Sequence, residues 1–140
     1  MGIEPTLAEE IGLTLEEARA IAQVACDAAE AGDLEGSKVV LESLVALNPR
    51  DRAVYAALGT VYQKLDLLPE AEAAYTAAIT GGEHRMARIN RAELRLKRGD
   101  QGGLEDLESL VKDAPHVIDQ PAARAKILMD LRRAGSRAHR

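Results

Sequence analysis

The chain has 140 residues, 46% of them apolar, with a formal net charge of −5, and this length suits one domain with a sizeable core. Cys26 is the single cysteine, which excludes a disulfide framework, and no apolar run approaches the roughly 18 residues of a membrane span. Ala and Leu dominate the apolar residues while Phe and Trp are absent, so the composition predicts an all-α protein that does not insert into membranes.

Charge is divided unevenly along the chain. Residues 1–83 carry 15 acidic and 5 basic side chains, whereas residues 84–140 carry 8 acidic and 13 basic ones. A partner would therefore meet surfaces of opposite sign. No aromatic residue lies among the arginines to stack on a base, so we expect no nucleic-acid partner.

The N-terminal segment, residues 1–13, is predicted to form a short helical lead-in. Ile3, Leu7 and Ile11 recur at four-residue spacing on one amphipathic face. We expect this face to cover the first helix pair, and the alternative is that it joins two copies of the chain in a homodimer. The acidic residues of this segment stand where a secretory signal would carry positive charge, so we expect a cytoplasmic location.

A first helix pair is predicted over residues 15–49. Thr14 and Glu17 form a capping-box signature at its start, and Gly32 and Asp33 supply the turn between the two helices. The second helix ends at Asn48, because the residue before Pro49 is disfavoured in the helical region.

A second pair, over residues 52–83, carries the most specific pattern in the chain. Its spacing of aromatic, Leu-Gly, Tyr, Ala and aromatic residues takes in all three tyrosines of the protein. The positions are Tyr55, Leu58, Gly59, Tyr62, Ala71 and Tyr75. Gly59 and Ala71 are small enough to let two antiparallel helices pack closely.

A third pair, over residues 84–115, repeats the pattern less well. Its second helix aligns with the second helices of the other two pairs only if the turn of the third pair is two residues shorter. Gly99 and Asp100 form that turn, and Pro115 ends the pair. A last helix over residues 119–135 is expected to begin at Asp119 to Pro121 and to end near Gly135, capping the stack with a polar outer face.

The period of about 34 residues resembles that of the tetratricopeptide repeat family over residues 15–115. The resemblance implies helical hairpin repeats that form a short right-handed superhelix within a single domain. It also implies a concave groove, lined by the first helix of each pair, that receives an extended or helical peptide. Carried over, the groove positions are Arg19, Ala22, Cys26, Ala29, Ala53, Ala56, Thr60, Gln63, Ala87, Asn90, Leu94 and Lys97.

One subgroup of the family grips the terminal carboxylate of chaperone tails with Lys, Asn and Arg. The corresponding positions here are Ala22, Cys26, Ala57, Ala87 and Arg91. Only Arg91 matches, so that function is rejected.

The length, the helical lead-in and the acidic charge are instead similar to those of bacterial type III secretion chaperones of the translocator class. That resemblance implies a cytoplasmic chaperone that holds a peptide or amphipathic helix of a secreted translocator. The alternative is an assembly adaptor that uses its convex or basic surface.

Five arginines at spacings of three or four form a basic stripe, namely Arg85, Arg88, Arg91, Arg95 and Arg98. A solvated helix face is the simplest interpretation. The stripe could also contact an acidic partner, or pair with Glu70 and Glu72 of the second helix pair. If it is a contact surface, exchanging Arg88 and Arg95 for Glu should disturb only that contact.

No catalytic or metal site is predicted, so we expect neither an enzyme nor a cofactor. His84, His116 and His139 are far apart and match no ligand spacing, and Cys26 is read as a small apolar residue. The glycine-rich stretch at residues 99–103 lacks the Lys and hydroxyl residue of a phosphate-binding loop and is interpreted as a turn.

Overall fold

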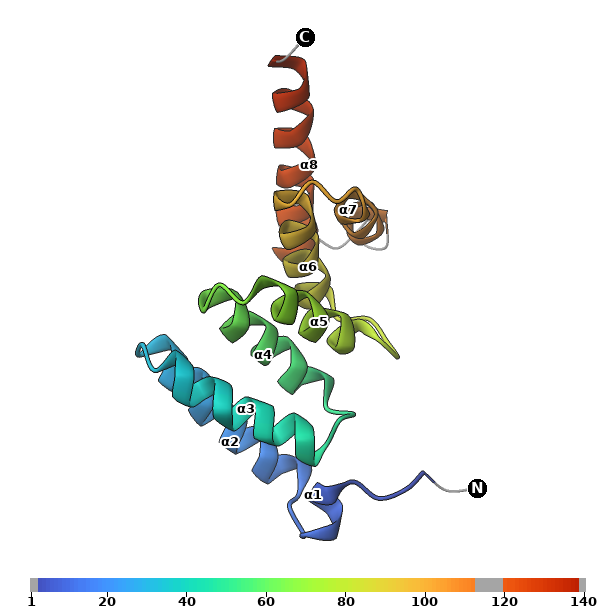
Figure 1. Cartoon of the computed structure of the whole chain (residues 1–140). Coiled ribbons are helices and arrows are strands. Elements are labelled where there is room, and N and C mark those ends of the chain that lie inside the picture. The colour runs from blue at the N-terminus through green and yellow to red at the C-terminus, as the bar shows by residue number, and fades with distance from the viewer. Residues whose placement is uncertain (1–2, 113–119, 139–140) are drawn as a thin grey trace. The chain divides into compact units, whose positions relative to one another are not determined.

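The computed structural model describes residues 3–112 and 120–138, and every regular element in these residues is an α-helix. The chain divides into two compact units, unit 1 (residues 1–80) and unit 2 (residues 81–140). Figure 1 shows the helices in chain order. They are α1 (Leu7–Glu10), α2 (Leu15–Glu30), α3 (Leu34–Leu47), α4 (Arg52–Lys64), α5 (Leu68–Ile79), α6 (Arg85–Lys97), α7 (Gly102–Lys112) and α8 (Gln120–Ala138). The predicted fold class, all-α helical hairpins, is confirmed.

The start of α2 is fixed by the predicted capping box. Thr14 Oγ1 accepts a hydrogen bond from the Glu17 amide at 3.1 Å, and Glu17 Oε1 accepts one from the Thr14 amide at 3.1 Å. These bonds satisfy amides that the first helical turn leaves unpaired. The bond from the Thr14 backbone, followed by that from its side chain, lowers the pKa of Glu17.

The turn within each hairpin places one residue in the left-handed region of the backbone. Gly32 (φ 103°) and Gly99 (φ 82°) occupy this position in the first and third pairs, as expected for glycine. The second pair has Asp66 there at φ 61°, and Asp is one of the few other residues that tolerate this conformation. The three hairpins therefore share a turn geometry even though their turn sequences differ.

The core of unit 1 is built from the facing sides of α2, α3 and α4, around Leu41, Leu44, Val54 and Leu58. The α4–α5 hairpin is closed by Tyr75, whose side chain is fully buried. A Cβ atom added at Gly59 would lie 2.5 Å from Tyr75 Cε1, so the tyrosine ring occupies the space that glycine leaves. This contact explains why the sequence pattern couples a glycine on α4 to an aromatic residue on α5.

Ser37 on α3 is also fully buried, and its hydroxyl has no hydrogen-bond partner among the described residues. A buried unsatisfied hydroxyl costs stability, and Ser also has a lower helix propensity than Ala. Ser37→Ala should therefore raise the free energy of unfolding of unit 1 by about 1 kcal/mol. Urea denaturation followed by circular dichroism measures this change.

Ser43→Ala is the matched control for that experiment. Ser43 lies on the same helix but is exposed, and its hydroxyl donates to the Val39 carbonyl at 2.8 Å. The same substitution there should leave the unfolding midpoint nearly unchanged. A destabilised Ser37→Ala variant would contradict the assignment of an unsatisfied hydroxyl.

Unit 2 packs α6, α7 and α8 around Ile89, Ala92, Leu107, Leu110 and Ala125. A Cβ atom at Gly103 would lie 2.8 Å from the Ala92 carbonyl oxygen, which shows how closely α7 approaches α6. The last helix was expected to end near Gly135, and α8 continues three residues further, to Ala138. The side chains of residues 130–138 are all exposed, so no packing opposes the longer helix. Pro115 and Asp119, which were expected to flank the preceding loop, lie outside the described residues.

The N-terminal apolar face does not cover the first helix pair, which corrects the expectation from the sequence. Ile3, Leu7 and Ile11 are 81%, 56% and 66% exposed, and Ala8 is the buried residue of α1. The reason is length, because α1 is a single turn and cannot carry three residues at four-residue spacing on one helical face. The alternative, contact between two copies, stays a prediction.

Candidate peptide-binding surface

In unit 1, the predicted groove positions lie on the first helices α2 and α4, which contact each other. Ala22 and Cys26 on α2 and Ala53, Ala56 and Thr60 on α4 are all at least partly exposed. These side chains are small, so an approaching chain could contact the helices closely. Arg19 is exposed on the same side of α2 and adds one positive charge.

Two polar groove positions on α4 are held by the buried tyrosine of α5. Tyr75 Oη donates to Gln63 Oε1 at 2.8 Å and lies 3.5 Å from Thr60 Oγ1. A ligand that uses the Gln63 amide would therefore meet a side chain already fixed in position. Ala29, in contrast, belongs to the apolar core of unit 1 and presents little surface.

Cys26 stands on this face with a half-buried thiol. Burial raises its pKa, and the nearby carboxylates of Asp27 and Glu30 raise it further, while Lys64 acts in the opposite direction. Its thiol therefore stays protonated at neutral pH, which agrees with the interpretation of Cys26 as a small apolar residue.

The four groove positions predicted on α6 belong to unit 2. Ala87 and Leu94 are buried, whereas Lys97 is exposed. The Asn90 side-chain oxygen accepts a hydrogen bond from Arg124 Nη1 of α8 at 3.3 Å. Their part in peptide binding stays a prediction.

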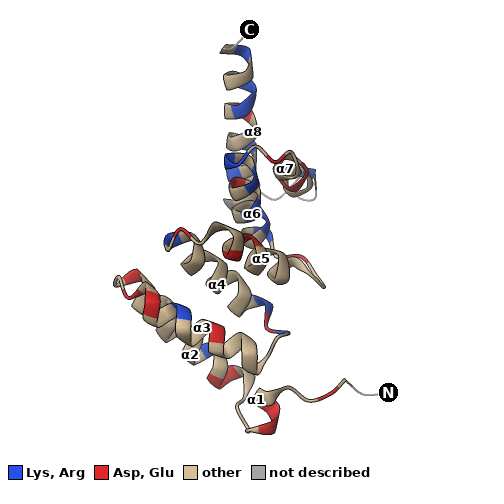
Figure 2. Cartoon of the chain, in the orientation of Figure 1, with Lys and Arg blue, Asp and Glu red and all other residues tan. Residues whose placement is uncertain are grey.

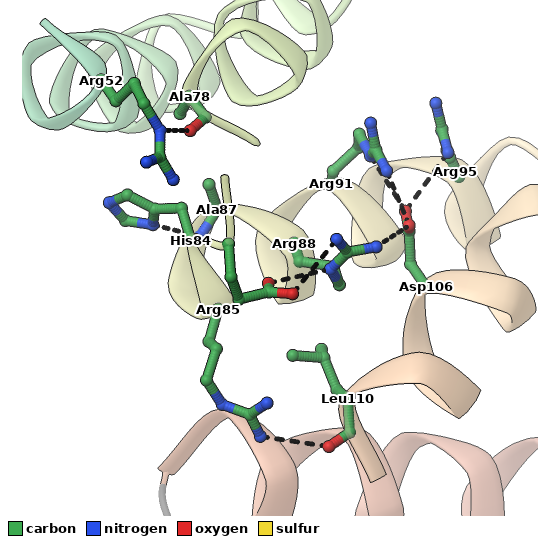
Figure 3. A network of polar contacts seen from close by, with 11 residues as sticks. Arg52, Ala78, His84, Arg85, Ala87, Arg88, Arg91, Arg95, Asp106 and Leu110 are labelled. Carbon is green, nitrogen blue, oxygen red and sulfur yellow. Dashed lines mark hydrogen bonds and ion pairs between the residues drawn. The ribbon is translucent and has the colours of Figure 1, made fainter. Parts of the chain in front are cut away.

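Most of the basic stripe on α6 is engaged within unit 2. Figure 3 shows three of its guanidinium groups directed at the carboxylate of Asp106 on α7. Arg91 binds it with two bonds, Nε to Oδ2 at 3.0 Å and Nη2 to Oδ1 at 2.7 Å, and Arg95 Nη1 donates to Oδ2 at 3.2 Å. Arg88 Nη1 lies 3.5 Å from Oδ1 and also pairs with Glu83. We call these three arginines and Asp106 the Asp106 network.

The two end residues of the stripe also have internal partners. Arg85 Nη2 donates to the Leu110 carbonyl at 3.1 Å, and Arg98 Nη2 donates to Asp100 Oδ2 at 2.7 Å. The stripe therefore joins α6 to α7 rather than forming a purely solvated face. Exchanging Arg88 and Arg95 for Glu would break the Asp106 network, so the expectation that this change disturbs only a surface contact is wrong.

A cleft that the sequence analysis did not identify lies on the other side of unit 1, between the second helices α3 and α5 and the helix α4. Its volume is about 410 Å³. We call it the α3–α5 cleft. It is lined by Glu42, Val45, Tyr55, Leu58, Tyr62, Glu70, Ala73 and Ala74. The seven-residue spacing of the two tyrosines was visible in the sequence, but the positions of the two glutamates beside them depend on helix packing.

Tyr62 donates its hydroxyl to Glu42 Oε2 at 2.9 Å across the α3–α5 cleft. Burial, followed by the hydrogen bond to Glu42, raises the pKa of Tyr62 to about 12. The phenol is thus harder to ionise in the folded protein than in the unfolded chain, whose tyrosines titrate near pH 10. The resulting stabilisation is fully present below pH 10 and is lost as the pH rises towards 12.

Unfolding by urea at pH 9 and pH 11 should reveal this linkage. The wild-type midpoint should fall more between the two pH values than the midpoint of Tyr62→Phe, because the variant lacks the ionisable phenol. Parallel falls in the two proteins would show that Tyr62 does not carry the effect.

The histidines contribute no metal site within the described residues. His84 is the N-cap of α6, where its Nδ1 accepts from the Ala87 amide at 3.2 Å. His116 and His139 lie outside residues 3–112 and 120–138. In those residues no group of three or more metal-binding side chains occurs, and none of the helices has the length and the apolar character of a membrane span.

Comparisons with known proteins identify the fold. No protein-family model matches the chain, and no curated protein matches it in sequence. Among solved structures, the type III secretion translocator chaperone SycD of Yersinia enterocolitica aligns over 93% of this chain and 99% of its own, with a TM-score of 0.81 at 16% identity. This chain has the fold of a translocator chaperone.

Two structures of another such protein are similar as well. PcrH of Pseudomonas aeruginosa aligns over 85% of this chain and 93% of its own, with a TM-score of 0.75 at 21% identity. PcrH in complex with the chaperone binding region of PopD aligns over 89% of this chain and 97% of its own, with a TM-score of 0.77 at 21% identity. The translocator-chaperone fold therefore extends over most of the chain, in agreement with the expected all-α fold of helical hairpin repeats.

Proposed function

We propose that this protein is a type III secretion chaperone that binds a segment of a translocator protein on the α2 and α4 face of unit 1. The translocator-chaperone fold carries the proposal, together with the solved complex of PcrH with a region of PopD. The exposed small residues on α2 and α4 supply a surface on which an extended or helical segment can lie. A chaperone of this kind acts before export, so we place it in the cytoplasm.

The chemistry of the face indicates how such a segment is held. Ala22, Ala53 and Ala56 leave room for large apolar side chains of the partner, which supply most of the buried area. Arg19 and the fixed amide of Gln63 can orient its polar groups. Affinity then resides mainly in the partner's apolar residues, which suits a chaperone that keeps a membrane-active protein soluble.

Ala56→Glu tests this proposal directly. The substitution places a charged side chain among the small residues of the α2 and α4 face, which we call the small-residue face. There it blocks apolar contact with the partner, and its charge is costly to desolvate. Co-purification of a secreted, membrane-active protein with the wild-type chain is expected, and the variant should bind that protein at least about tenfold more weakly, a change of about 1.4 kcal/mol. Isothermal titration calorimetry with the purified partner measures the change.

Ala20→Glu is the matched control, since Ala20 is an exposed alanine on α2 that is not among the groove positions. It should bind the partner as the wild type does, and circular dichroism should show both variants folded. Equal binding by wild type and Ala56→Glu would remove the α2 and α4 face as the binding surface.

The second candidate function is an assembly adaptor that uses its convex or basic surface. The Asp106 network argues against the basic surface as the contact surface of such an adaptor, because three of its arginines bind Asp106 inside unit 2. The α3–α5 cleft favours an adaptor that uses its convex surface, because this cleft of about 410 Å³ is lined by residues other than the groove positions on α2 and α4.

A further inference from the structure

The α3–α5 cleft combines an apolar floor with aromatic and acidic walls. Val45, Leu58 and Ala74 supply aliphatic surface, and Tyr55 and Tyr62 add two phenol rings from α4. Its volume of about 410 Å³ lies at the lower end of the range of about 300–1,000 Å³ for ligand pockets. The cleft therefore has room for one or two protein side chains.

The carboxylates at this cleft have no cationic partner among the described residues. Within residues 3–112 and 120–138, Glu42 accepts a hydrogen bond only from the neutral hydroxyl of Tyr62, and Glu70 makes no hydrogen bond or ion pair. Lys38, one turn before Glu42 on α3, pairs instead with Glu35 at 3.1 Å. Two negative charges thus flank the cleft without compensation.

The surroundings strengthen this negative field. Unit 1 has 14 acidic and 5 basic side chains, and Figure 2 shows acidic residues on α1, α2, α3 and α5. Part of the role of Glu70 is structural, because it lies in the first turn of α5, where a negative charge favours the helix dipole. Glu42 lies in the middle of α3 and has no such role.

We propose that the α3–α5 cleft is a second docking site of this protein, which binds an Arg or Lys side chain flanked by apolar residues in a partner protein. The aliphatic stem would lie on Val45 and Leu58, and the cationic head would face the tyrosine rings and the two glutamates. Long basic side chains bury their methylene groups while their charge stays near a polar edge, and a cation over an aromatic face is attracted by it. The occupant is chosen by charge complementarity, since an acidic segment would be repelled by Glu42 and Glu70.

Two capped synthetic peptides provide the test. The first has the sequence Ala-Leu-Arg-Leu-Ala, and in the second citrulline replaces Arg. Citrulline keeps the length and shape of Arg but has no charge. Binding is followed by nuclear magnetic resonance of the tyrosine ring protons, because Tyr55 and Tyr62 are two of three tyrosines in the chain. The Arg peptide should bind at least fivefold more tightly than the citrulline peptide and should shift both rings.

Variants then localise the effect. Glu42→Gln and Glu70→Gln should each weaken binding of the Arg peptide about threefold, and the double variant about tenfold. Glu30→Gln removes the same charge from an exposed site on α2 outside the cleft and should change binding less than twofold. Ala56→Glu should also leave it unchanged, so failure of this second site is distinguishable from failure of the proposed chaperone function.

Three results would overturn the proposal. Equal binding of the Arg and citrulline peptides would show that charge is not recognised. Equal weakening by Glu30→Gln and Glu42→Gln would assign the effect to net charge rather than to the cleft. Binding of free arginine amide as tightly as the peptide would exclude a contribution from flanking residues and hence a docked protein segment.

Discussion

Asp106→Asn should destabilise the α6–α7 hairpin by about 3–5 kcal/mol, the usual loss when one partner of a buried ion pair is removed. The Asp106 side chain is 5% exposed, and those of Arg88, Arg91 and Arg95 are only 12–22% exposed. Removing the carboxylate charge leaves three partly buried guanidinium groups without their common partner. Their mutual repulsion then acts directly on α6.

Hydrogen exchange read by mass spectrometry is suited to this prediction, because it resolves the two units separately. Peptides from residues 85–112 should lose protection in Asp106→Asn, while peptides from α2 to α5 should not. Asp100→Asn is the control, since Asp100 pairs with Arg98 at an exposed site and the same substitution there should leave the protection of α6 and α7 nearly unchanged. Unchanged protection of α6 and α7 in Asp106→Asn would show that the network does not hold the hairpin.

Tyr75→Ala should destabilise unit 1 by about 3–5 kcal/mol, as large-to-small changes of buried aromatic residues do. The ring is fully buried and fills the space above Gly59, so its removal opens a cavity between α4 and α5. The free energy of unfolding from urea denaturation measures the loss. A change below about 1 kcal/mol would contradict close packing at this site.

In the same experiment, Tyr75→Phe distinguishes the contribution of the ring to the free energy of unfolding from that of the hydroxyl. The variant keeps the packing against Gly59 but loses the hydrogen bond to Gln63, so it should cost only about 0.5–1.5 kcal/mol. It should also free the Gln63 side chain on the α4 face. Comparison of the two variants therefore assigns the stability mainly to packing and the positioning of Gln63 to the hydroxyl.

The helix pairs could be predicted from the sequence because their signals are local. The capping box at Thr14, the glycine turns at Gly32 and Gly99 and the spacing around Tyr75 each lie within a few residues or within one repeat. The structure places α2 to α7 inside the three predicted pairs. The third pair was recognisable even with its shorter turn, since Gly99 and Asp100 kept the turn and Pro115 marked the end of the pair.

The partners of the charged residues could not be predicted, because they depend on which helix faces which. The stripe on α6 has the spacing of a solvated face, and the sequence places Asp106 on a different helix, 11 residues beyond Arg95. Likewise Glu42 and Tyr62 meet only after α3 packs beside α4. Patterns within one helix indicate that a face is charged, but not what neutralises it.

Within each unit, the helices contact mainly their neighbours in the chain, as α2 with α3, α3 with α4, α4 with α5, and α6 with α7. Structures in which contacts join residues close in sequence have a low contact order and fold quickly, in microseconds to milliseconds for helical proteins. The apolar core of unit 1 around Leu41 and Leu58 consists of residues that all precede Thr80. Unit 1 can therefore fold while the ribosome is still synthesising unit 2, so the small-residue face of α2 and α4 forms before translation of the chain is finished.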